Sequence, residues 1–348
     1  MRVKASFVLS PKICEICGRF RPMSDTFYPF YPDFSSKRFL VTGGAGFIGS
    51  HVLNFLSESK ALHVKVLDNL STGYHSNIQH CLRLPNFQWI EGDITDEQIC
   101  LAACRDVDVV IHLAALGSVP RSIANPLASH AANSTGFLNV LWAAKENKVS
   151  KVVYASSSSV YGDQMDLPKR EGREGSPLSP YAFTKQSNEA YAKLFSELYG
   201  LQTIGLRFFN VFGPRQNKLG PYAAFIPLAL DALLAGTALT IFGDGKQSRD
   251  FTYVANSVWA VRGAVEAGEE ASGKAYNVAC GDSTSLLDVV AMLEEVGGKK
   301  IEVKFAAPRQ GDIKDSLADI SKAKNYLAFD SIADLKSGLK MTYNAFMP

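Results

Sequence analysis

Short apolar runs alternate with amphipathic stretches between residues 38 and 208, which is the pattern of strands and helices taken in turn. Strands are predicted at 38–42, 63–68, 87–91, 107–113, 150–156 and 201–208. Helices are predicted at 47–58, 96–104, 127–147 and 182–199. Continuous apolar strands separated by helices are typical of a parallel sheet that is buried on both faces. The expected fold class is therefore α/β, with a doubly wound parallel sheet.

At 348 residues the chain is long for a single core, so we expect a large domain and a smaller lobe. Residues 1–37 precede the first strand and contain prolines that discourage regular structure, so they are expected to form an N-terminal extension. Residues 38–209 are expected to form most of the main domain. Residues 210–348 are expected to form mainly a smaller α/β lobe, interleaved with the last elements of the main domain.

The composition is that of an ordinary globular protein: 47% of the residues are hydrophobic, 20% are charged and the formal net charge is +2. Charges so close to balance give no reason to expect nucleic acid or an acidic membrane surface as a partner. No apolar run reaches the length of about 18 residues that spans a bilayer.

The six cysteines do not have the spacing of a secreted disulfide scaffold, so a reducing cytoplasm is the expected location. Cys14 and Cys17 form a C-x-x-C pair, but a structural zinc needs about four ligands and no second pair follows at a suitable spacing. We therefore expect plain thiols and no metal site. A zinc or redox role of the pair is the alternative, and translation from Met23 would remove the pair.

Four glycines follow the first predicted strand at once, at positions 43, 44, 46 and 49. Glycine permits a tight turn and lets backbone N–H groups approach phosphates, while the N-terminus of the next helix adds partial positive charge. The second strand ends in Asp68, 19 residues after Gly49, where a carboxylate would bind the adenosine ribose and repel a 2′-phosphate. Strand, turn, helix and acid together predict a Rossmann-type site for NAD, in preference to NADP.

Hydroxyls and a Tyr–Lys pair are predicted to gather near the carboxyl end of the fifth strand, where open α/β sheets bind ligands. The strand runs into Ser157 and Ser158, while Tyr181 and Lys185 lie four residues apart on one helix face. A tyrosine with the ordinary pKa near 10 is a poor base, but a neighbouring ammonium and a positively charged nicotinamide both favour the phenolate and lower that pKa. We therefore predict that Tyr181 is a catalytic base. An amphipathic helix with an exposed lysine is the alternative.

Two further polar residues lie in or after predicted strands. Asp93 follows the third strand and could accept a hydrogen bond from the adenine amino group, with an ordinary strand-end aspartate as the alternative. His112 lies inside an apolar run, so we expect a hydrogen-bonded core histidine and not a catalytic one.

Several stretches together resemble the extended short-chain dehydrogenase/reductases: Thr42–Gly49, Asp68–Gly73, His112–Ala115, Ser156–Gly162, Tyr181–Lys185 and Leu206–Gly213. Within that family the chain is most similar to the UDP-N-acetylglucosamine 4-epimerases of bacterial polysaccharide pathways. The stretches that carry the narrower likeness are Ala115–Ser122, Pro177–Ala182, Phe209–Gln216, Gly243–Phe251 and Gly311–Ile320. The resemblance covers residues 37–330; it is weak over 267–305 and absent from the first 37 residues.

The resemblance implies a tightly bound NAD that is recycled at each turnover. The residues that would hold its pyrophosphate and adenosine are Gly43, Gly46, Phe47, Ile48, Gly49, Asp68, Asn69, Ser71, Thr72, Gly73, Asp93 and Ile94. Those that would line the rest of the cofactor are Ala114, Ala115, Asn133, Tyr181, Lys185 and Phe209. Lys185 would bond the nicotinamide ribose as well as lower the pKa of Tyr181.

The implied reaction is the 4-epimerisation of a UDP-sugar through a transient 4-keto sugar. The Tyr181 phenolate would remove the proton of the 4-hydroxyl while C4 passes a hydride to NAD; the ketone would then turn over and regain the hydride on its other face. Ser157 would hydrogen-bond the 4-oxygen, with help from Ser158. The other substrate contacts implied are Ser118, Arg121, Asn210, Gln216, Ala224, Arg249, Arg309 and Ser316.

Ser316 is expected to decide which sugar is accepted. In the related epimerases this position abuts the sugar 2-substituent, and a tyrosine there excludes an N-acetyl group. The serine therefore implies conversion of UDP-N-acetylglucosamine to UDP-N-acetylgalactosamine, with UDP-glucose and UDP-galactose as a second pair.

Three other readings stay open. A UDP-hexuronic acid 4-epimerase or decarboxylase would need a cation near the C6 carboxylate, for which Arg121 and Lys218 are candidates. A nucleotide-sugar reductase would consume added NADH, and an NAD-binding scaffold would have no turnover. Members of the family commonly dimerise through two helices that match 127–147 and 182–199, so a homodimer is expected.

Overall fold

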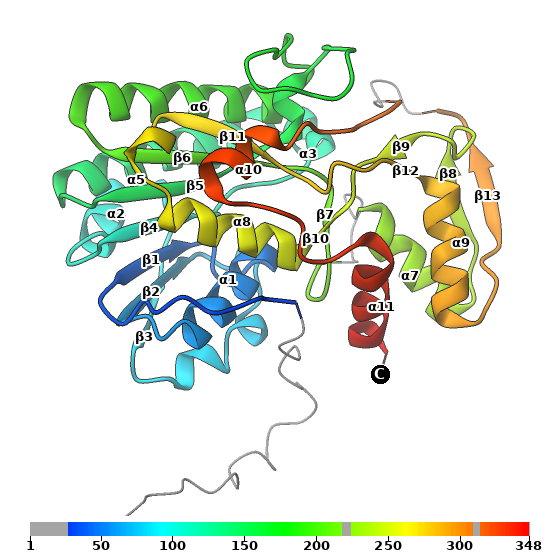
Figure 1. Cartoon of the computed structure of the whole chain (residues 1–348), viewed down its shortest axis with the longest axis horizontal. Coiled ribbons are helices and arrows are strands. Elements are labelled where there is room, and N and C mark those ends of the chain that lie inside the picture. The colour runs from blue at the N-terminus through cyan, green and yellow to red at the C-terminus, as the bar shows by residue number, and fades with distance from the viewer. Residues whose placement is uncertain (1–26, 218–223, 309–313, 348) are drawn as a thin grey trace, which may run out of the picture.

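A computed structural model describes residues 27–217, 224–308 and 314–347. At the centre of these residues lies a parallel sheet of seven strands in the order β11-β6-β5-β4-β1-β2-β3 (Figure 1). The strands are β1 (Arg38–Thr42), β2 (His63–Asp68), β3 (Phe87–Glu91), β4 (Val109–His112), β5 (Lys151–Ser157), β6 (Gln202–Phe208) and β11 (Lys274–Val278). β1 pairs with β2 on one side and with β4 on the other, which is where the strand order reverses. The predicted α/β class with a doubly wound parallel sheet is confirmed.

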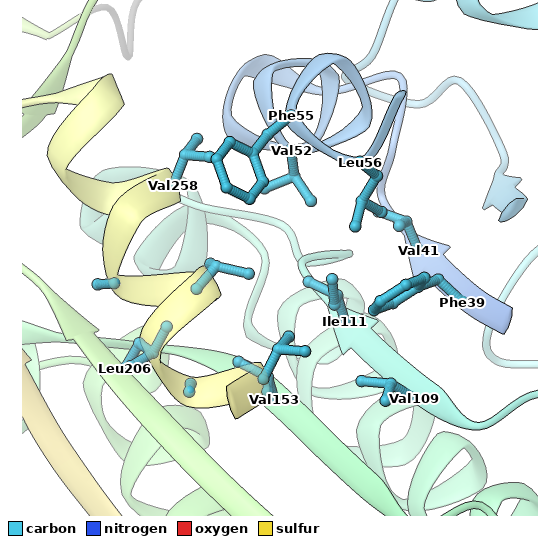
Figure 2. Packing of buried hydrophobic residues seen from close by; sticks show 14 of the residues in the cluster. Phe39, Val41, Val52, Phe55, Leu56, Val109, Ile111, Val153, Leu206 and Val258 are labelled. Atoms are coloured by element: carbon cyan, nitrogen blue, oxygen red, sulfur yellow. The ribbon is translucent and has the colours of Figure 1, made fainter. Parts of the chain in front are cut away.

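Helices cover both faces of this sheet (Figure 1). α1 (Phe47–Glu58) and α8 (Val254–Glu266) pack together on one face, while α2 (Glu97–Ala103), α5 (Gly136–Glu146) and α6 (Pro180–Tyr199) lie on the other. Figure 2 shows the first of these layers, in which Val52 and Phe55 of α1 face Val258 of α8 above the strands. The spacing of the apolar residues on α1 is that of a helix with one buried face.

The predicted helix at 127–147 is divided in the structure. It comprises α4 (Pro126–His130), a π-helical stretch η3 (Ala131–Thr135) and α5, and all three follow one another without a gap. π turns inside helices occur frequently at functional sites, and this one carries Asn133. The short helix α3 (Val119–Ala124), which precedes α4, was not predicted from the sequence.

The smaller lobe packs around its own apolar cluster beside the carboxyl ends of the strands (Figure 1). Its helices and paired strands are α7 (Phe225–Ala235), β8 (Leu239–Phe242), α9 (Leu286–Gly297), β13 (Val303–Ala306) and α11 (Leu335–Phe346). Two-residue strands join the lobes: β7 (Val211–Phe212) with β10 (Thr252–Tyr253), and β9 (Ser248–Arg249) with β12 (Thr284–Ser285). The chain returns to the main domain as α8 and β11 between β10 and β12, and again as α10 (Ser321–Leu327) after β13. The remaining short 3₁₀ turns are η1 (His75–Asn77), η2 (Cys81–Arg83), η4 (Ser158–Tyr161) and η5 (Glu269–Ala271).

Residues 27–37 contain no helix or strand, yet they are packed against the main domain. Phe34 is 3% exposed and lies 5.3 Å from Phe39, measured between ring centroids. Tyr28 makes an edge contact with Phe55 at 5.0 Å, and Phe30 contacts Trp259 at 5.2 Å. This part of the predicted extension is therefore held by the core and is not a loose tail.

Candidate active site

The glycine turn after β1 passes so close to neighbouring backbone that side chains would not fit. A Cβ at Gly43, where φ is +71°, would lie 2.6 Å from the backbone nitrogen of Ala114. A Cβ at Gly49 would lie 2.2 Å from the carbonyl oxygen of Gly43. Gly46 caps α1 without a side chain, and Phe47 and Ile48 open the helix half-buried. The backbone N–H groups of this turn and helix start form a cradle of the kind that binds a pyrophosphate.

Asp68 ties the next loop to the glycine turn. One of its carboxylate oxygens accepts from the backbone N–H of Ala45 at 2.9 Å and the other from that of Leu70 at 2.8 Å. Burial raises the pKa of Asp68, while these two hydrogen bonds oppose the rise. Each oxygen keeps a second lone pair for a ribose hydroxyl. Gly73 closes the loop against Ala45, and the intervening Ser71 and Thr72 are exposed.

Asp93 and Asn69 form the next part of the wall. The Asn69 amide donates to Asp93 at 2.7 Å, and the backbone N–H of Thr95 donates to the other oxygen at 2.8 Å. Burial alone would raise the pKa of Asp93, but the hydrogen bonds from Thr95 and Asn69 lower it below its usual range. Asp93 is therefore an ionised acceptor beside the buried Ile94.

Two residues expected to line the cofactor are buried in the structure. Asn133 is 1% exposed, and its amide is bonded to both backbone groups of Leu116 at 2.7 and 3.1 Å. It thereby fixes the loop that follows Ala114 and Ala115. Phe209 has no exposed surface and packs on Tyr161. The cofactor contacts expected of Asn133 and Phe209 stay predictions.

His112 is confirmed as a hydrogen-bonded core residue. Its Nδ1 lies 2.9 Å from the Thr42 hydroxyl, and the side chain is buried. Burial, followed by the charge of Lys185, lowers the pKa of His112 to about 3, so the ring is neutral.

The predicted Tyr–Lys pair lies at the start of α6, beside the end of β5. Tyr181 follows Pro180 at the first helical position, and its side chain is hydrogen-bonded to Ser157. The Nζ of Lys185 lies 5.9 Å from the centroid of the Tyr181 ring and donates to the carbonyl oxygen of Ala155 at 2.8 Å. Ser158, half-buried, begins the 3₁₀ turn that caps the strand. The structure thus brings Ser157, Tyr181 and Lys185 together.

Burial sets the electrostatics of this pair. It lowers the pKa of Lys185 to about 8, against the opposing charge of Glu189. It also raises the pKa of Tyr181, which the hydrogen bond from Ser157 only partly offsets. The lowering of the Tyr181 pKa was expected from Lys185 together with a positively charged nicotinamide; among the chain's own groups, the cost of burying a phenolate is the larger effect. A further positive charge at the site is needed to favour the phenolate.

The loop after β4 holds two expected substrate contacts in a strained conformation. Ser118 has φ +100°, which a non-glycine residue adopts at a cost, and such strain is concentrated at functional sites. Its hydroxyl accepts from the backbone N–H of Arg121 at 3.3 Å and so caps α3. Arg121 is half-buried on that helix.

Arg249 and Ser316 lie on neighbouring segments of the smaller lobe. Arg249 donates to the carbonyl oxygens of Ser248 at 2.8 Å and Lys314 at 3.1 Å. The backbone N–H of Ser316 donates to Ser248 at 3.1 Å, and Ser316 is 8% exposed. Arg309, Lys218 and the pair Cys14 and Cys17 lie outside the described residues.

The remaining expected contacts lie at the junction of the lobes. Asn210 donates to the carbonyl oxygen of Asp250 at 3.1 Å. Gln216 donates to that of Val211 at 3.0 Å, while its own amide oxygen is buried and accepts no hydrogen bond from the residues that the structure describes. A buried acceptor without a partner is costly, so it suits a ligand donor. Ala224 is exposed where α7 begins.

Sequence reasoning missed three polar residues near the site: the buried Arg207 and Asp250 and the half-buried Glu189. Asp250 accepts from the backbone N–H groups of Cys280, Gly281 and, at 3.3 Å, Ala318. Burial raises its pKa to about 6, and the hydrogen bonds oppose the rise. Arg207 and Asp250 lie inside stretches that carry the family likeness, which was the available signal.

The part of the chain that the structure describes contains no helix long and apolar enough to cross a membrane. The same residues contain no group of three or more His, Cys, Asp or Glu side chains that could hold a metal ion.

Known proteins share this fold and sequence over most of the chain. The profile of the NAD dependent epimerase/dehydratase family matches residues 39–279. A UDP-N-acetylglucosamine 4-epimerase from Methanobrevibacter ruminantium, solved with UDP-N-acetylmuramic acid, is 40% identical; the match covers 90% of this chain and 98% of that one with a TM-score of 0.84. A UDP-glucose 4-epimerase from Thermotoga maritima with UDP-glucose is 35% identical over 89% and 98% of the two chains, with a TM-score of 0.83.

A UDP-glucuronic acid 4-epimerase from Bacillus cereus, solved with UDP-glucuronic acid and NAD, is 33% identical over 88% and 98% of the two chains, with a TM-score of 0.82. These three relatives differ in the sugar but share the 4-epimerase activity in their names. The family profile covers more than half of this chain, and the two 4-epimerase structures above are 40% and 35% identical to it over most of both chains. The chain therefore belongs to the NAD-dependent epimerase/dehydratase family and is a nucleotide-sugar 4-epimerase that uses NAD.

Proposed function

We propose that this enzyme interconverts UDP-N-acetylglucosamine and UDP-N-acetylgalactosamine, and that it also accepts UDP-glucose and UDP-galactose. The observation that carries the choice of sugar is Ser316, a small residue on the segment beside Arg249. A serine at this position leaves room for an N-acetyl group that a tyrosine would exclude.

The residues present fit an NAD. The glycine turn packs backbone on backbone where a Cβ at Gly43 or Gly49 would clash, Asp68 offers acceptors for a ribose, and Asp93 is an ionised acceptor at the predicted adenine end. When bound, NAD supplies the hydride acceptor and donor that the epimerisation needs. Residues Gly43, Gly46 and Gly49 would accommodate its pyrophosphate.

The proton is handled by the chain itself. Tyr181 is the proposed base that takes the proton of the sugar 4-hydroxyl, because its phenol is fixed beside Ser157 at the carboxyl end of β5. Ser157 would orient the 4-oxygen by donating a hydrogen bond to it. The ammonium of Lys185 would stabilise the phenolate, since opposite charge nearby favours the ionised form.

The smaller lobe would hold the nucleotide while the sugar turns over. The Arg249 guanidinium has a geometry that suits paired phosphate oxygens. Its hydrogen bonds to the carbonyl oxygens of Ser248 and Lys314 fix the orientation of the guanidinium. The unpartnered amide oxygen of Gln216 suits an N–H donor of the substrate. Arg309 is proposed as a second diphosphate ligand from the family likeness alone.

A uronic acid is the second candidate for the sugar, because one relative is named for UDP-glucuronic acid. Arg121 would have to supply the charge that recognises the C6 carboxylate. Arg121 lies in the first turn of α3, and its backbone N–H is bonded to the hydroxyl of the N-cap residue Ser118. The backbone of Arg121 is therefore fixed next to the loop after β4.

The test is a comparison of substrates without added NAD. Purified enzyme is incubated separately with UDP-N-acetylglucosamine, UDP-glucose and UDP-glucuronic acid, and the epimers are resolved by chromatography. The proposal predicts conversion of the N-acetylated sugar. Conversion of UDP-glucuronic acid alone would establish the second candidate, and conversion of UDP-glucose alone would disprove the role of Ser316.

A homodimer is proposed as well, through α5 and α6. Most of the apolar residues expected at that interface point into the core of their own domain, such as Phe137 and Phe195. Trp142, Leu194 and Leu198 remain exposed, at 36%, 47% and 68%, and form the surface that a second copy would cover. Sedimentation equilibrium should give about twice the chain mass of 37.8 kDa.

A further inference from the structure

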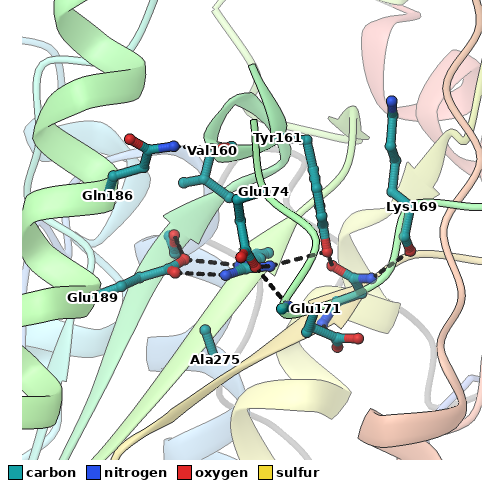
Figure 3. A network of polar contacts seen from close by, with 12 residues as sticks. Val160, Tyr161, Lys169, Glu171, Glu174, Gln186, Glu189 and Ala275 are labelled. Carbon is teal, nitrogen blue, oxygen red and sulfur yellow. Dashed lines mark hydrogen bonds and ion pairs between the residues drawn. The ribbon is translucent and has the colours of Figure 1, made fainter. Parts of the chain in front are cut away.

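An ion cluster with a buried arginine at its centre is joined to the helix that carries the catalytic pair. Its centre is Arg207 of β6, which is 4% exposed. Two of its nitrogens donate to the two carboxylate oxygens of Glu189 at 2.9 and 2.6 Å, and the third lies 2.5 Å from Glu174 and 3.0 Å from the Tyr161 hydroxyl. Figure 3 shows Glu189, Glu174 and Tyr161 converging on this guanidinium. We call these four residues the Arg207 cluster.

Glu189 links the cluster to the residues that act on substrate. It follows Lys185 by one helical turn on α6 and acts on the Lys185 ammonium through its charge. One of its oxygens accepts from the Ser156 hydroxyl at 2.5 Å. Ser156 immediately precedes Ser157, the hydrogen-bond partner of Tyr181. The same carboxylate is therefore fixed to β5 and faces Lys185 from within α6.

The charges explain why such a group is needed. Lys185 is 2% exposed, and burial penalises its ammonium. The titratable groups that face it are Tyr181 and Glu189 from α6 and His112 from β4, and His112 is neutral. Two carboxylates surround one guanidinium, so the Arg207 cluster has a surplus negative charge that can offset the ammonium.

We propose that Glu189 is a positioning residue for the epimerisation: its carboxylate keeps Lys185 charged, and Arg207 sets how much of that negative charge Lys185 experiences. The inference rests on the proposed roles of Tyr181 and Lys185. Glu189 itself touches neither substrate nor cofactor. Its effect on turnover passes through the protonation of Lys185.

The test is the pH profile of kcat for Glu189→Gln, with bound NAD and the melting temperature measured in parallel. The substitution keeps the shape of the side chain and removes the charge. Loss of the opposite charge four residues along the helix lowers the pKa of the Lys185 ammonium by about one unit. The alkaline limb of the kcat profile therefore moves to lower pH by about one unit. At pH 8 the charged fraction of a lysine with a pKa of about 8 then falls about fivefold, and kcat falls with it.

Glu174→Gln is the matched control. It removes the other carboxylate from the same guanidinium, but Glu174 comes from the segment before α6 and does not act on Lys185. It should lower the melting temperature while shifting the alkaline limb less than half as far. Equal shifts in the two variants would overturn the proposal, because a merely structural cluster predicts no difference between them.

Arg207→Lys is expected to shift the alkaline limb in the opposite direction from Glu189→Gln. It also provides a test if the Glu189→Gln protein does not fold. A single ammonium cannot hold both oxygens of Glu189, so more of the negative charge is felt by Lys185 and the alkaline limb should move to higher pH. A downward shift or no shift would overturn the proposal. Absence of turnover in the wild-type enzyme with all UDP-sugars would instead refute the proposed function, which separates the two failures.

Discussion

Substitution of Gly49 by alanine should weaken the binding of NAD by moving the backbone that cradles it. The added Cβ would lie 2.2 Å from the carbonyl oxygen of Gly43 and 2.8 Å from the Cα of Gly44. Ordinary contacts begin at 3.4 Å, so the turn and the start of α1 must separate by 1.2 Å at the first of these contacts. Both obstacles are backbone atoms, which cannot rotate away. Overpacking of this kind costs about 1–3 kcal/mol.

Because every 1.4 kcal/mol corresponds to about a tenfold change in affinity, NAD should bind roughly tenfold to a hundredfold more weakly if the strain falls on the bound state. The assay is the amount of NAD released per chain on denaturation after extensive dialysis, together with the melting temperature of the NAD-free protein. Gly117→Ala is the control, since a Cβ there would have no atom within 4 Å. A Gly49→Ala protein that retains NAD and melts as the wild type does would refute the close packing of the turn.

Three further substitutions test other parts of the account. Tyr181→Phe should lower kcat by about 10²–10⁴-fold without loss of bound NAD, as measured by chromatography of the epimers; an active phenylalanine variant would exclude Tyr181 as the base. Ser316→Tyr should abolish turnover of UDP-N-acetylglucosamine and spare that of UDP-glucose. Equal loss of both activities would contradict the role of Ser316 in the choice of sugar. Phe34→Ala should cost about 3–5 kcal/mol of stability in denaturant unfolding, because Phe34 is buried. The half-exposed Phe30 is its control, at about 1 kcal/mol or less, and equal costs would mean that this segment is not packed as described.

The main domain could be predicted closely because its signals are local. β1, β2, β3 and α1 have the bounds that the apolar runs and the glycine turn indicate. Tyr181 and Lys185 could be paired from helical spacing alone, and His112 could be assigned to the core from its apolar neighbours.

What could not be predicted depends on partners that are distant in the sequence. The packing of Tyr28 on Phe55 and Trp259 requires α1 and α8 to be in place, and no local pattern in the extension shows it. Likewise the pairing of Arg207 with Glu189 joins a strand to a helix across the sheet. Local patterns report secondary structure, whereas these contacts exist only once the layers have packed.

Burial at the site could not be predicted either. Phe209 was expected near the cofactor from the family likeness, and nothing in that likeness indicates its full burial against Tyr161. The pKa of Tyr181 was expected to be lowered by Lys185 and a positively charged nicotinamide together, and burial of the phenol opposes that lowering. Neither the coverage of a side chain nor the cost of burying a charge can be calculated from residue spacing.

The central claim is that this chain inverts C4 of a UDP-sugar by transient oxidation and internal return of the same hydrogen. The most direct measurement uses UDP-N-acetylglucosamine with deuterium at C4, incubated with the enzyme in ordinary water without added NAD, and follows the product by mass spectrometry. The account predicts UDP-N-acetylgalactosamine that retains the deuterium, because the hydrogen stays within the site throughout. Product that has exchanged its deuterium for solvent hydrogen, or no epimer from any UDP-sugar, would contradict it.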